Sequence, residues 1–560
     1  MATTDPRPPI PAPWTASEER LFPRLSPAQI ARIATHGRVR RVQSGDVLLD
    51  VTDRLARFFV VVSGEIEVVR VSGDAVERVA VFRPGQFTGE VNLLSGRRAL
   101  VRIRASESGE VIEVDRDQGL ALVQTDSELS EVLMRAFILR RAELIARGIG
   151  DVVLVGSSHC AGTLRVKEFL TRNGHPHSYL DLDGDPGVQD LLDRFHVATR
   201  DVPVLICRGW LVLRNPTNQQ IADCLGFNDA VDETRLRDVV VVGAGPSGLA
   251  AAVYGASEGL DVLVLETTAP GGQAGSSSRI ENYLGFPTGV SGQELAARAY
   301  NQAQKFGAQV LIAKPATKLS CERRPYAVEV EGGSRMKART VIIATGAAYR
   351  KLPLVDLARF EGAGVYYGAT FMEAQLCRGE EVIVVGGGNA AGQAAVFLAR
   401  AARRVHLLVR SAGLADSMSR YLVRRIEESP DIVLRTRTEI VALEGESHVE
   451  RVQWRDGAGA VEGHPIRHVF VMTGAEPSTQ WLEGCVVLDG KGFIKTGTDL
   501  TPEELAKAGW PLARSPHLLE SSLPGVFAVG DVRGGSMKRV ASAVGEGSTA
   551  VAFVHKVLQE

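Results

Sequence analysis

Two glycine-rich turns in the second half of the chain carry the strongest chemical signal. The first reads Gly243-Ala-Gly245-Pro-Ser-Gly248, follows four consecutive valines and precedes an alanine-rich helical run. Glycines at this spacing allow a tight turn and a close backbone approach, and the helix N-terminus that follows binds a pyrophosphate. Glu266 ends the next apolar strand, where a carboxylate accepts the hydroxyls of a ribose. The pattern predicts a dinucleotide-binding site.

The second turn differs from the first in one charge. Gly386-Gly-Gly388-Asn389-Ala-Ala391 also follows an apolar strand and opens a helix, but the next strand ends in Arg410 instead of a carboxylate. Because arginine pairs with a 2′-phosphate, this site is predicted to bind NADPH rather than NADH. A solvated Arg410 is the alternative. Two dinucleotide sites in one chain indicate a flavin that is reduced by a nicotinamide.

Further motifs occur in an order typical of one flavoprotein family. They are Pro270-Gly-Gly-Gln273, Ile280-Glu-Asn282-Tyr283, Ala344-Thr345-Gly346, Gly386–Asn389, Thr473–Pro477 and Gly530-Asp531, followed by Arg539-Val540-Ala541. From about Arg237 to the C-terminus, the sequence resembles the two-domain thioredoxin reductases of low molecular weight. The resemblance implies an oxidoreductase that uses FAD and NADPH.

The resemblance also assigns roles to residues. It places Gln273 and Asn282 beside the isoalloxazine and lets Asp531 bond the ribityl chain. The helix that starts near Val540 would face the pyrimidine edge, where a helix N-terminus stabilises the anion of reduced flavin. The predicted FAD-binding residues are Gly243, Gly245, Gly248, Glu266, Gly272, Gln273, Asn282, Thr345, Gly346, Gly530, Asp531, Arg539, Val540 and Ala541. The predicted NADPH-binding residues are Gly386, Gly388, Asn389, Ala391 and Arg410.

The sequence departs from that family at its thiols. Disulfide reductases of the family carry CxxC shortly before the second glycine turn, whereas this chain reads Tyr367-Gly368-Ala369-Thr370-Phe371. Gly368 and Phe371 occupy the two thiol positions, which leaves no thiolate for the usual exchange. We therefore predict an enzyme that is not a conventional thioredoxin reductase. Cys377, six residues on, is expected to fill the core.

The middle of the chain carries a different thiol. Gly156-Ser-Ser-His159-Cys160-Ala-Gly-Thr163 lies at a strand-to-helix turn, and Val202-Pro203 follows later. Residues 150–231 are similar to thioredoxin and glutaredoxin domains, with Thr163 in place of the second cysteine and Pro203 as the cis-proline. A thiolate at a helix N-terminus beside a histidine has a lowered pKa, so Cys160 is a tentative catalytic residue. A docking domain with an inert Cys160 is the alternative.

The N-terminal region has the glycine pattern of a small β domain. Gly64 and Gly85 and the stretch from Phe87 to Val101 resemble the cyclic nucleotide-binding domains. The resemblance implies that the nucleotide would lie against Gly89, with Glu90 on the ribose and either Arg97 or Arg98 on the phosphate. That stretch is two residues shorter than the usual pattern. Nucleotide binding and a vestigial interaction module both stay open.

Composition excludes other classes of protein. Lys+Arg minus Asp+Glu is 64 − 66 = −2, which disfavours a dedicated binder of nucleic acid or of anionic membranes. The sequence has neither an apolar run long enough to span a membrane nor a secretory signal, so we predict a cytoplasmic protein. The six cysteines form no CxxC pair, which predicts no metal site, and we expect no disulfide framework in a reducing compartment.

These motifs predict a multidomain α/β protein. The expected parts are a leader (1–14), a β-barrel cyclic-nucleotide-binding-like domain (15–148), a thioredoxin-like α/β domain (150–231), a linker (232–238), and two Rossmann-like domains. The FAD domain takes 237–352 and 475–560, and the NADPH domain takes 353–474. In the N-terminal domain, short strands are expected around 47–49, 59–61, 66–68 and 79–81, with breaks at Gly45, Gly64, Gly73 and Gly85.

The predicted function is an NADPH-dependent flavoprotein oxidoreductase. Its acceptor is either a Cys160-linked thiol or a non-thiol acceptor such as ferredoxin, a quinone or oxygen. The partners expected are a cyclic nucleotide as effector, a thioredoxin-like acceptor and a second copy in a homodimer. A signalling module that senses flavin redox state and a nucleotide, with little turnover, is the alternative from a different class.

Overall fold

The computed structural model of the chain describes residues 18–50, 53, 57–72, 75–89, 92–95, 97, 99–146, 152–157, 160–183, 201–207, 211–277, 279–280, 282–354, 357–369, 371–415 and 417–560. The chain forms two compact units. The first contains Met1–Val155, Asn173–Ala230 and Gln304–Gly307, and the second contains Gly156–Arg172, Val231–Ala303 and Ala308–Glu560. Within the described part of the chain, no helix is long and apolar enough to cross a bilayer.

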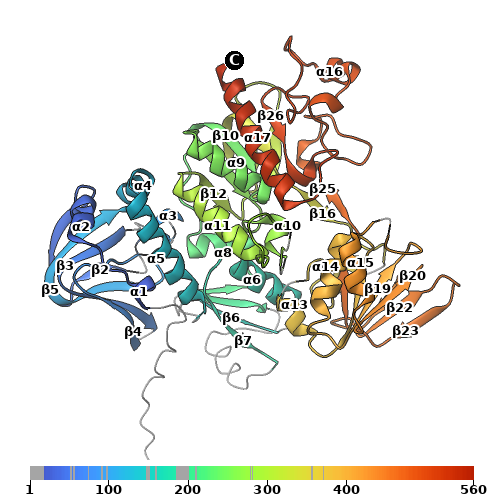
Figure 1. Cartoon of the computed structure of the whole chain (residues 1–560), viewed down its shortest axis with the longest axis horizontal. Helices are drawn as coiled ribbons and strands as arrows, with labels where there is room; N and C mark the ends of the chain where they lie inside the picture. The colour runs from blue at the N-terminus through green and yellow to red at the C-terminus, as the bar shows by residue number, and fades with distance from the viewer. Residues whose placement is uncertain are drawn as a thin grey trace, which may run out of the picture. The chain divides into compact units, whose positions relative to one another are not determined.

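The N-terminal β domain is an antiparallel sheet flanked by helices. Its strands lie in the order β1-β5-β3-β4, and β2 pairs with β5. Phenylalanines from the sheet and from α5, including Phe58, Phe87 and Phe137, fill the core between sheet and helices. The elements are α1 (Glu18–Leu21), α2 (Pro27–Ala34), β1 (Arg38–Val42), β2 (Val47–Leu49), β3 (Arg57–Ser72), β4 (Ala75–Phe82), α3 (Asn92–Ser95), β5 (Arg102–Asp115), α4 (Arg116–Thr125) and α5 (Ser127–Ala146) (Figure 1).

One strand boundary predicted from the sequence is wrong. Gly64 does not separate two strands, because β3 continues through it as one strand of 16 residues. The register between β3 and β5 shifts on both sides of Gly64, whose φ is +76°, and a Cβ there would lie 2.6 Å from the Ser108 carbonyl oxygen. Gly64 therefore forms an irregularity in the long β3–β5 pair, for which a left-handed glycine is the usual solution. Gly73 lies outside the described residues.

The middle segment contains a four-stranded sheet with the order β7-β6-β8-β9. The strand β8 pairs antiparallel with both β6 and β9. The Val202–Pro203 peptide bond is cis, as the sequence predicted. The sequence pattern also predicts a helix at 188–195, which lies outside the described residues. The elements are β6 (Val152–Gly156), α6 (Ala161–Arg172), β7 (Ser178–Asp181), β8 (Val204–Cys207), β9 (Leu211–Arg214) and α8 (Asn218–Leu225).

The outer α/β domain, in the second unit, is built on a mixed sheet with the order β12-β11-β10-β15-β14-β13, and β26 pairs with β15. The valine-rich β10 lies between two parallel neighbours, β11 and β15, which is typical of a strand buried on both faces. Helices α9 and α17 lie side by side (Figure 1). The elements before the insertion are β10 (Leu236–Val242), α9 (Pro246–Ser257), β11 (Val262–Glu266), α10 (Gly272–Gly275), α11 (Gly292–Lys305), β12 (Gln309–Ile312), β13 (Ala316–Ser320), β14 (Tyr326–Val330), β15 (Arg335–Ile343) and β16 (Ala347–Tyr349). Those after it are β25 (Ala475–Pro477), η2 (Gln480–Leu482), η3 (Gly497–Asp499), α16 (Pro502–Ala508), β26 (Val526–Ala528), η4 (Gly530–Val532) and α17 (Val540–Gln559).

The inserted α/β domain has a parallel sheet with the order β17-β24-β18-β19-β20 and a second, antiparallel sheet, β21-β22-β23. The chain enters this domain after β16 and leaves it before β25. These two short strands pair with each other next to the predicted boundaries. The elements are α12 (Leu357–Phe360), β17 (Val365–Tyr366), α13 (Phe371–Leu376), β18 (Glu381–Val385), α14 (Asn389–Leu398), β19 (Arg404–Val409), α15 (Arg420–Glu427), β20 (Ile432–Thr436), β21 (Glu439–Glu444), β22 (Arg451–Arg455), β23 (Val461–His464) and β24 (His468–Val471).

One pair of cysteines contradicts the expectation that the chain lacks disulfides. Cys321 and Cys485 are bonded, with their Cα atoms 5.8 Å apart and a separation of 164 positions in sequence. Cys321 follows β13 and Cys485 follows η2, and both pack against the core of the outer domain. The pairing arises from the tertiary contact between β13 and η2, which no spacing in the sequence reveals.

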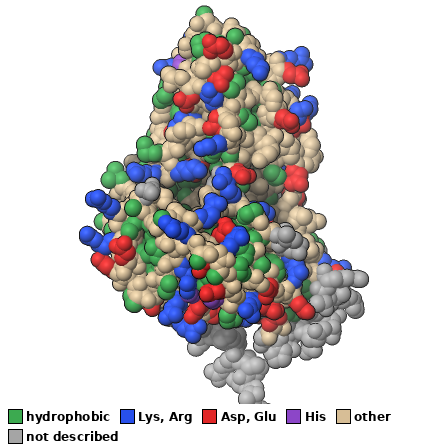
Figure 2. Space-filling model, turned by 90° about the vertical axis from the view of Figure 1, so that its right-hand side faces the viewer, with side chains coloured by type: hydrophobic (Ala, Val, Ile, Leu, Met, Phe, Trp, Pro, Cys, Tyr) green, Lys and Arg blue, Asp and Glu red, His purple; other side chains and the backbone are tan. Residues whose placement is uncertain are grey.

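Charges of both signs are spread over the surface. On the face that Figure 2 shows, basic and acidic side chains are interspersed, with small apolar groups between them. This mixture agrees with the net charge of −2.

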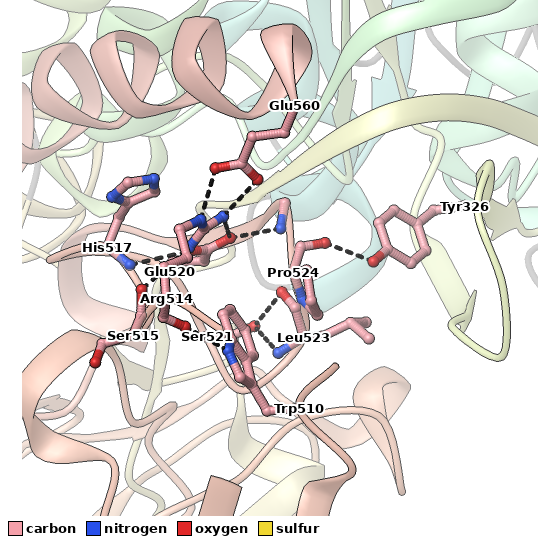
Figure 3. Close-up of polar contacts among 11 residues, drawn as sticks. Tyr326, Trp510, Arg514, Ser515, His517, Glu520, Ser521, Leu523, Pro524 and Glu560 are labelled. Carbon is pink, nitrogen blue, oxygen red and sulfur yellow. Dashed lines mark hydrogen bonds and ion pairs between the residues drawn. The ribbon is translucent and has the colours of Figure 1, made fainter. Parts of the chain in front are cut away.

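A buried carboxylate anchors the C-terminal segment of the outer domain (Figure 3). Glu520 is fully buried and pairs with Arg514, whose Nη1 lies 2.7 Å from Oε2. The backbone N–H groups of His517 and Gly525 also donate to this carboxylate. Arg514 in addition binds the carboxylate of Glu560, the last residue of the chain, at 2.6 Å. The guanidinium thus compensates a charge that is removed from water.

We predict that Arg514→Met destabilises the outer domain far more than loss of an exposed ion pair does. Removing one partner of a buried pair costs about 3–5 kcal/mol, because the other charge stays buried. The matched control is Arg455→Met, whose pair with Glu439 is half exposed and is expected to contribute less than about 1 kcal/mol. Thermal unfolding followed by circular dichroism should show a melting point several degrees lower for Arg514→Met alone. Equal melting points for the two variants would contradict the role of this pair.

Candidate functional site

Both glycine turns open into one cleft of about 1,500 Å³ in the second unit. The cleft is lined by both domains of that unit, with the β10–α9 turn on one side and the β18–α14 turn on the other. Among the residues predicted from the sequence, those that line it are Gly243, Gly245, Glu266, Gly272, Gln273, Thr345, Gly346, Gly386, Gly388, Asn389, Arg410, Asp531, Arg539 and Val540. The structure therefore brings most of the two predicted sites together.

Each of the three glycines of the first turn suits its position for a different physical reason. Gly243 has a φ of +104°, and a Cβ there would lie 2.4 Å from the Ala344 carbonyl oxygen on the neighbouring strand. A Cβ on Gly248 would lie 1.9 Å from the carbonyl oxygen of Gly243, so α9 packs directly on the turn. Gly245 instead faces the cleft, where a Cβ would meet only the Cα of Gly272 at 3.9 Å. It is also the N-cap of α9, and no side chain caps the helix.

Glu266 ends β11 at the floor of the cleft with its carboxylate held in place. Its Oε2 accepts the N–H of Ala244 at 2.7 Å, and its Oε1 accepts the N–H groups of Thr268 and Ala269 at 2.8 and 3.2 Å. The side chain is 8% exposed. Three backbone donors thus fix a buried carboxylate next to the first turn, at the position where the ribose was expected.

The second turn repeats this geometry with one small residue exchanged. A Cβ on Gly386 would lie 2.3 Å from the Met472 carbonyl oxygen, while Gly388 faces open space at the N-terminus of α14. Ala391 is buried in the helix behind the turn, so a methyl group is tolerated there. The exposed Arg410 lies at the rim, beside two residues that sequence reasoning missed, Ser411 and Ser417. Both are small polar residues in a loop, which no motif distinguished.

At the other end of the cleft, the polar groups come from three segments. Gln273 donates to the carbonyl of Ala347, and Asp531 is largely buried, which raises the pKa of its carboxyl. The helix α17 starts at Val540 without a side-chain cap, so its first N–H groups are available to a ligand. Lys538, which the sequence did not single out, also lines the cleft.

Five of the predicted FAD- and NADPH-binding residues do not line the cleft. Gly248 and Ala391 are buried behind the turns and act through packing. Gly530 is buried too, and its N–H donates to Glu546 at 2.6 Å. Asn282 and Ala541 are exposed and do not line the cleft.

The stretch that lacks the dithiol is only in part described. Gly368 has no atom within 4 Å of the position of a Cβ, and Phe371 begins α13; Thr370 lies outside the described residues. Cys377 is fully buried in the core of the inserted domain, and burial raises the pKa of its thiol to about 11. The prediction that Cys377 fills the core is confirmed.

Cys160 lies just before α6, a helix that the second unit includes. At the far end of α6, Arg172 donates to the carbonyl of Gly272 at 2.8 Å, so the helix is tied to the loop that lines the cleft. At the near end, the Cβ position of Gly362 in the inserted domain lies 3.2 Å from the Cβ of Ala161, the residue after Cys160. His159 lies outside the described residues. The helix that follows Cys160 therefore contacts both α/β domains.

The predicted nucleotide-binding residues of the N-terminal domain are only partly described. Glu90 and Arg98 lie outside the described residues. Arg97 is buried, its Nη1 donates to the carbonyl of Asn173 at 2.9 Å, and its guanidinium lies 4.3 Å from the centre of the Phe227 ring. Gly89 has a φ of +104° and its carbonyl accepts a bond from Arg140. Arg97 is thus engaged by the middle segment of the chain.

The cleft fits two dinucleotides. Each turn has a glycine whose absent side chain leaves room in the cleft and an uncapped helix N-terminus behind it, which together suit a pyrophosphate. The carboxylate of Glu266 follows the first turn and suits an unmodified ribose. The cation of Arg410 follows the second turn and suits a ribose with a 2′-phosphate.

Comparisons with known proteins agree with this geometry. Residues 237–547 match the family described as pyridine nucleotide-disulphide oxidoreductase, and residues 39–126 match the cyclic nucleotide-binding domain. The chain is 30% identical to a thioredoxin reductase of Listeria innocua over 330 residues, which is 59% of this chain and 96% of that protein.

Solved structures give the same result. The thioredoxin reductases of Lactococcus lactis and T. acidophilum each align with a TM-score of 0.51, at 26% and 27% identity. Each covers 58% of this chain and 100% of the solved chain. The match includes both domains that form the cleft, and it implies FAD and NADPH as cofactors. The chain therefore belongs to the pyridine nucleotide-disulphide oxidoreductase family, as an FAD-dependent NAD(P)H oxidoreductase similar to thioredoxin reductases.

Proposed function

We propose that this protein is an NADPH-specific flavoprotein reductase in which no dithiol of the inserted domain exchanges with the flavin. The observation that carries the proposal is the single cleft lined by both glycine turns, in a chain that has no CxxC. When bound, FAD accepts a hydride from NADPH and passes the electrons to an acceptor. The relatives are named thioredoxin reductases, but the acceptor here must be reached differently.

The chain's own groups bind and orient the two nucleotides. The helix N-termini of α9 and α14 hold the pyrophosphates, and Glu266 accepts the ribose hydroxyls of FAD. The start of α17, which has no side-chain cap, would hold the flavin near its free N–H groups and positive dipole end and would favour negative charge there. Arg410 would pair with the 2′-phosphate of NADPH at the rim. Because Arg410 is exposed there, this contact still allows the oxidised nucleotide to leave.

Any disulfide reduction then depends on Cys160. Two observations support this residue: α6 is bonded to the Gly272 loop of the cleft, and its first turn contacts Gly362 of the inserted domain. A thiolate at a helix N-terminus is stabilised by the backbone N–H groups. A single thiolate attacks an acceptor disulfide, which forms a mixed disulfide and releases one acceptor thiolate. The electron pair that NADPH supplies through FAD would then cleave the mixed disulfide, which releases the second acceptor thiolate and regenerates the Cys160 thiolate.

We predict that Gly245→Val gives protein without FAD. A Cβ at this position points into the cleft, so branched carbons there would push the pyrophosphate away from the turn. The control is Gly490→Val, at an exposed position without positive φ and with no atom within 4 Å of its Cβ. The ratio of absorbance at 450 and 280 nm measures flavin content. Full flavin content in Gly245→Val would refute the assignment of this turn.

We predict that wild-type protein prefers NADPH and that Arg410→Ala loses most of the preference. A charge-assisted contact contributes about 1.5–3 kcal/mol, and the exposure of Arg410 favours the lower end, so KM for NADPH should rise roughly tenfold. KM for NADH should stay unchanged. Arg400→Ala, at an exposed position outside the cleft, is the control. Equal use of both nucleotides by the wild type would show that Arg410 is only solvated.

We predict that disulfide reduction is weak and is lost in Cys160→Ser. Reduction of an artificial quinone should stay at the wild-type rate, because it does not use the thiol. Cys224→Ser removes another partly exposed cysteine that lies outside the disulfide and serves as the control. NADPH oxidation with thioredoxin, ferredoxin and quinone acceptors measures both activities. A Cys160→Ser variant that still reduces thioredoxin as fast as dithiol reductases do would disprove the proposed thiol. Negligible turnover with every acceptor would favour a sensor over an enzyme.

A further inference from the structure

One carboxylate of α17 accepts hydrogen bonds from three residues of the loop that joins β26 to this helix. Glu546 lies in the second turn of α17, and its side chain is 15% exposed. Its Oε2 accepts the N–H of Gly530 at 2.6 Å. Its Oε1 accepts from Nη2 of Arg533 at 2.6 Å and from the hydroxyl of Ser536 at 3.3 Å. The carboxylate therefore holds the loop at three points.

This loop supplies several of the groups that line the cleft. Asp531 follows Gly530 directly, in the same 3-10 turn, and lines the cleft. Lys538, Arg539 and Val540 line it at the end of the loop, where α17 begins. The resemblance to thioredoxin reductases assigns Asp531 to the ribityl chain of FAD. Because Gly530 and Asp531 are bonded neighbours, the position of the Asp531 carboxylate depends on where Gly530 is held.

Gly530 also packs closely against α9. A Cβ at this position would lie 2.6 Å from the hydroxyl oxygen of Ser247, in the first turn of α9. The helix α17 packs on the same turn, since a Cβ on Gly547 would lie 2.1 Å from the Ser247 carbonyl oxygen. Helices α9 and α17 lie side by side (Figure 1). Gly530 is therefore held by a packing contact with α9 and by a hydrogen bond to α17.

The charges around Glu546 give the carboxylate a reason to stay in place. The guanidinium of Arg533, 17% exposed, compensates its charge. Burial raises the pKa of the Asp531 carboxyl, Lys538 opposes this rise and Glu546 adds to it, so the two acids interact electrostatically. A side chain without an acceptor at position 546 would leave the buried N–H of Gly530 and the guanidinium of Arg533 without this partner, which is costly.

We propose that Glu546 is a positioning residue for FAD, which holds the Gly530–Asp531 turn so that Asp531 can bond the ribityl chain. Glu546 does not line the cleft itself, so it acts through the turn and not through contact with the cofactor. The proposal rests on FAD binding, which membership of the family implies. It is independent of the preference for NADPH, of Cys160 and of the electron acceptor.

The test compares the release of FAD with unfolding in the flavin-loaded protein. Flavin fluorescence measures FAD release and far-UV circular dichroism measures unfolding, in the same heating scan. We expect Glu546→Ala to release FAD at temperatures where it is still folded, about tenfold or more faster than the wild type at the same temperature. The matched control is Glu258→Ala, which removes a carboxylate that pairs with His555 of α17 away from the cleft. FAD release from this control should match the wild type.

A second variant keeps the proposal testable if Glu546→Ala does not fold. Glu546→Gln keeps an oxygen that can accept the N–H of Gly530 but loses the charge opposite Arg533. It should release FAD faster than the wild type and more slowly than Glu546→Ala.

Three results would overturn the proposal. The first is an unchanged rate of FAD release in a folded Glu546→Ala or Glu546→Gln. The second is FAD release that begins in these variants only when they unfold, because the carboxylate would then stabilise the fold alone. The third is an equal acceleration of release in Glu258→Ala, because the effect would then belong to any carboxylate that pairs with α17.

Discussion

The close packing of each glycine turn against the strand beside it is the constraint on which the cleft depends. Side chains at Gly243 or Gly386 would overlap a backbone carbonyl of the adjacent strand, so only glycine lets the turns lie this deep. This depth brings the helix N-termini of α9 and α14 to the floor of the cleft, with their N–H groups uncapped. We propose that the charges that follow, Glu266 and Arg410, distinguish the two nucleotide sites.

In the proposed function, thiol chemistry does not take place in that cleft. The inserted domain has Gly368 at one former thiol position, its one remaining cysteine, Cys377, is buried with a raised pKa, and the disulfide Cys321–Cys485 joins core elements of the outer domain. Cys160 alone sits at a strand-to-helix turn, on a helix whose two ends contact both α/β domains. We therefore propose that electrons leave this reductase-type cleft without passing through a dithiol of the inserted domain.

Structural features that depend on interactions between residues close in sequence were predictable from local sequence patterns. The glycine turns, the cis-proline at Pro203 and the buried Cys377 follow from short-range rules and are found as expected. Features that depend on tertiary contacts were not predictable. The glycine pattern predicts a break at Gly64, but β3 continues through this residue and stays paired with β5. The two cysteines of the disulfide meet only because β13 packs on η2.

The most direct test of the account is an anaerobic titration of the flavin-loaded protein with NADPH, followed by the flavin absorbance near 450 nm. Each NADPH delivers one electron pair, and a flavin without an exchanging disulfide stores one pair. The account predicts complete bleaching at one equivalent of NADPH per FAD, in wild type and in Cys160→Ser alike. Complete bleaching only at two equivalents would contradict it, because a protein disulfide would then be taking electrons from the flavin.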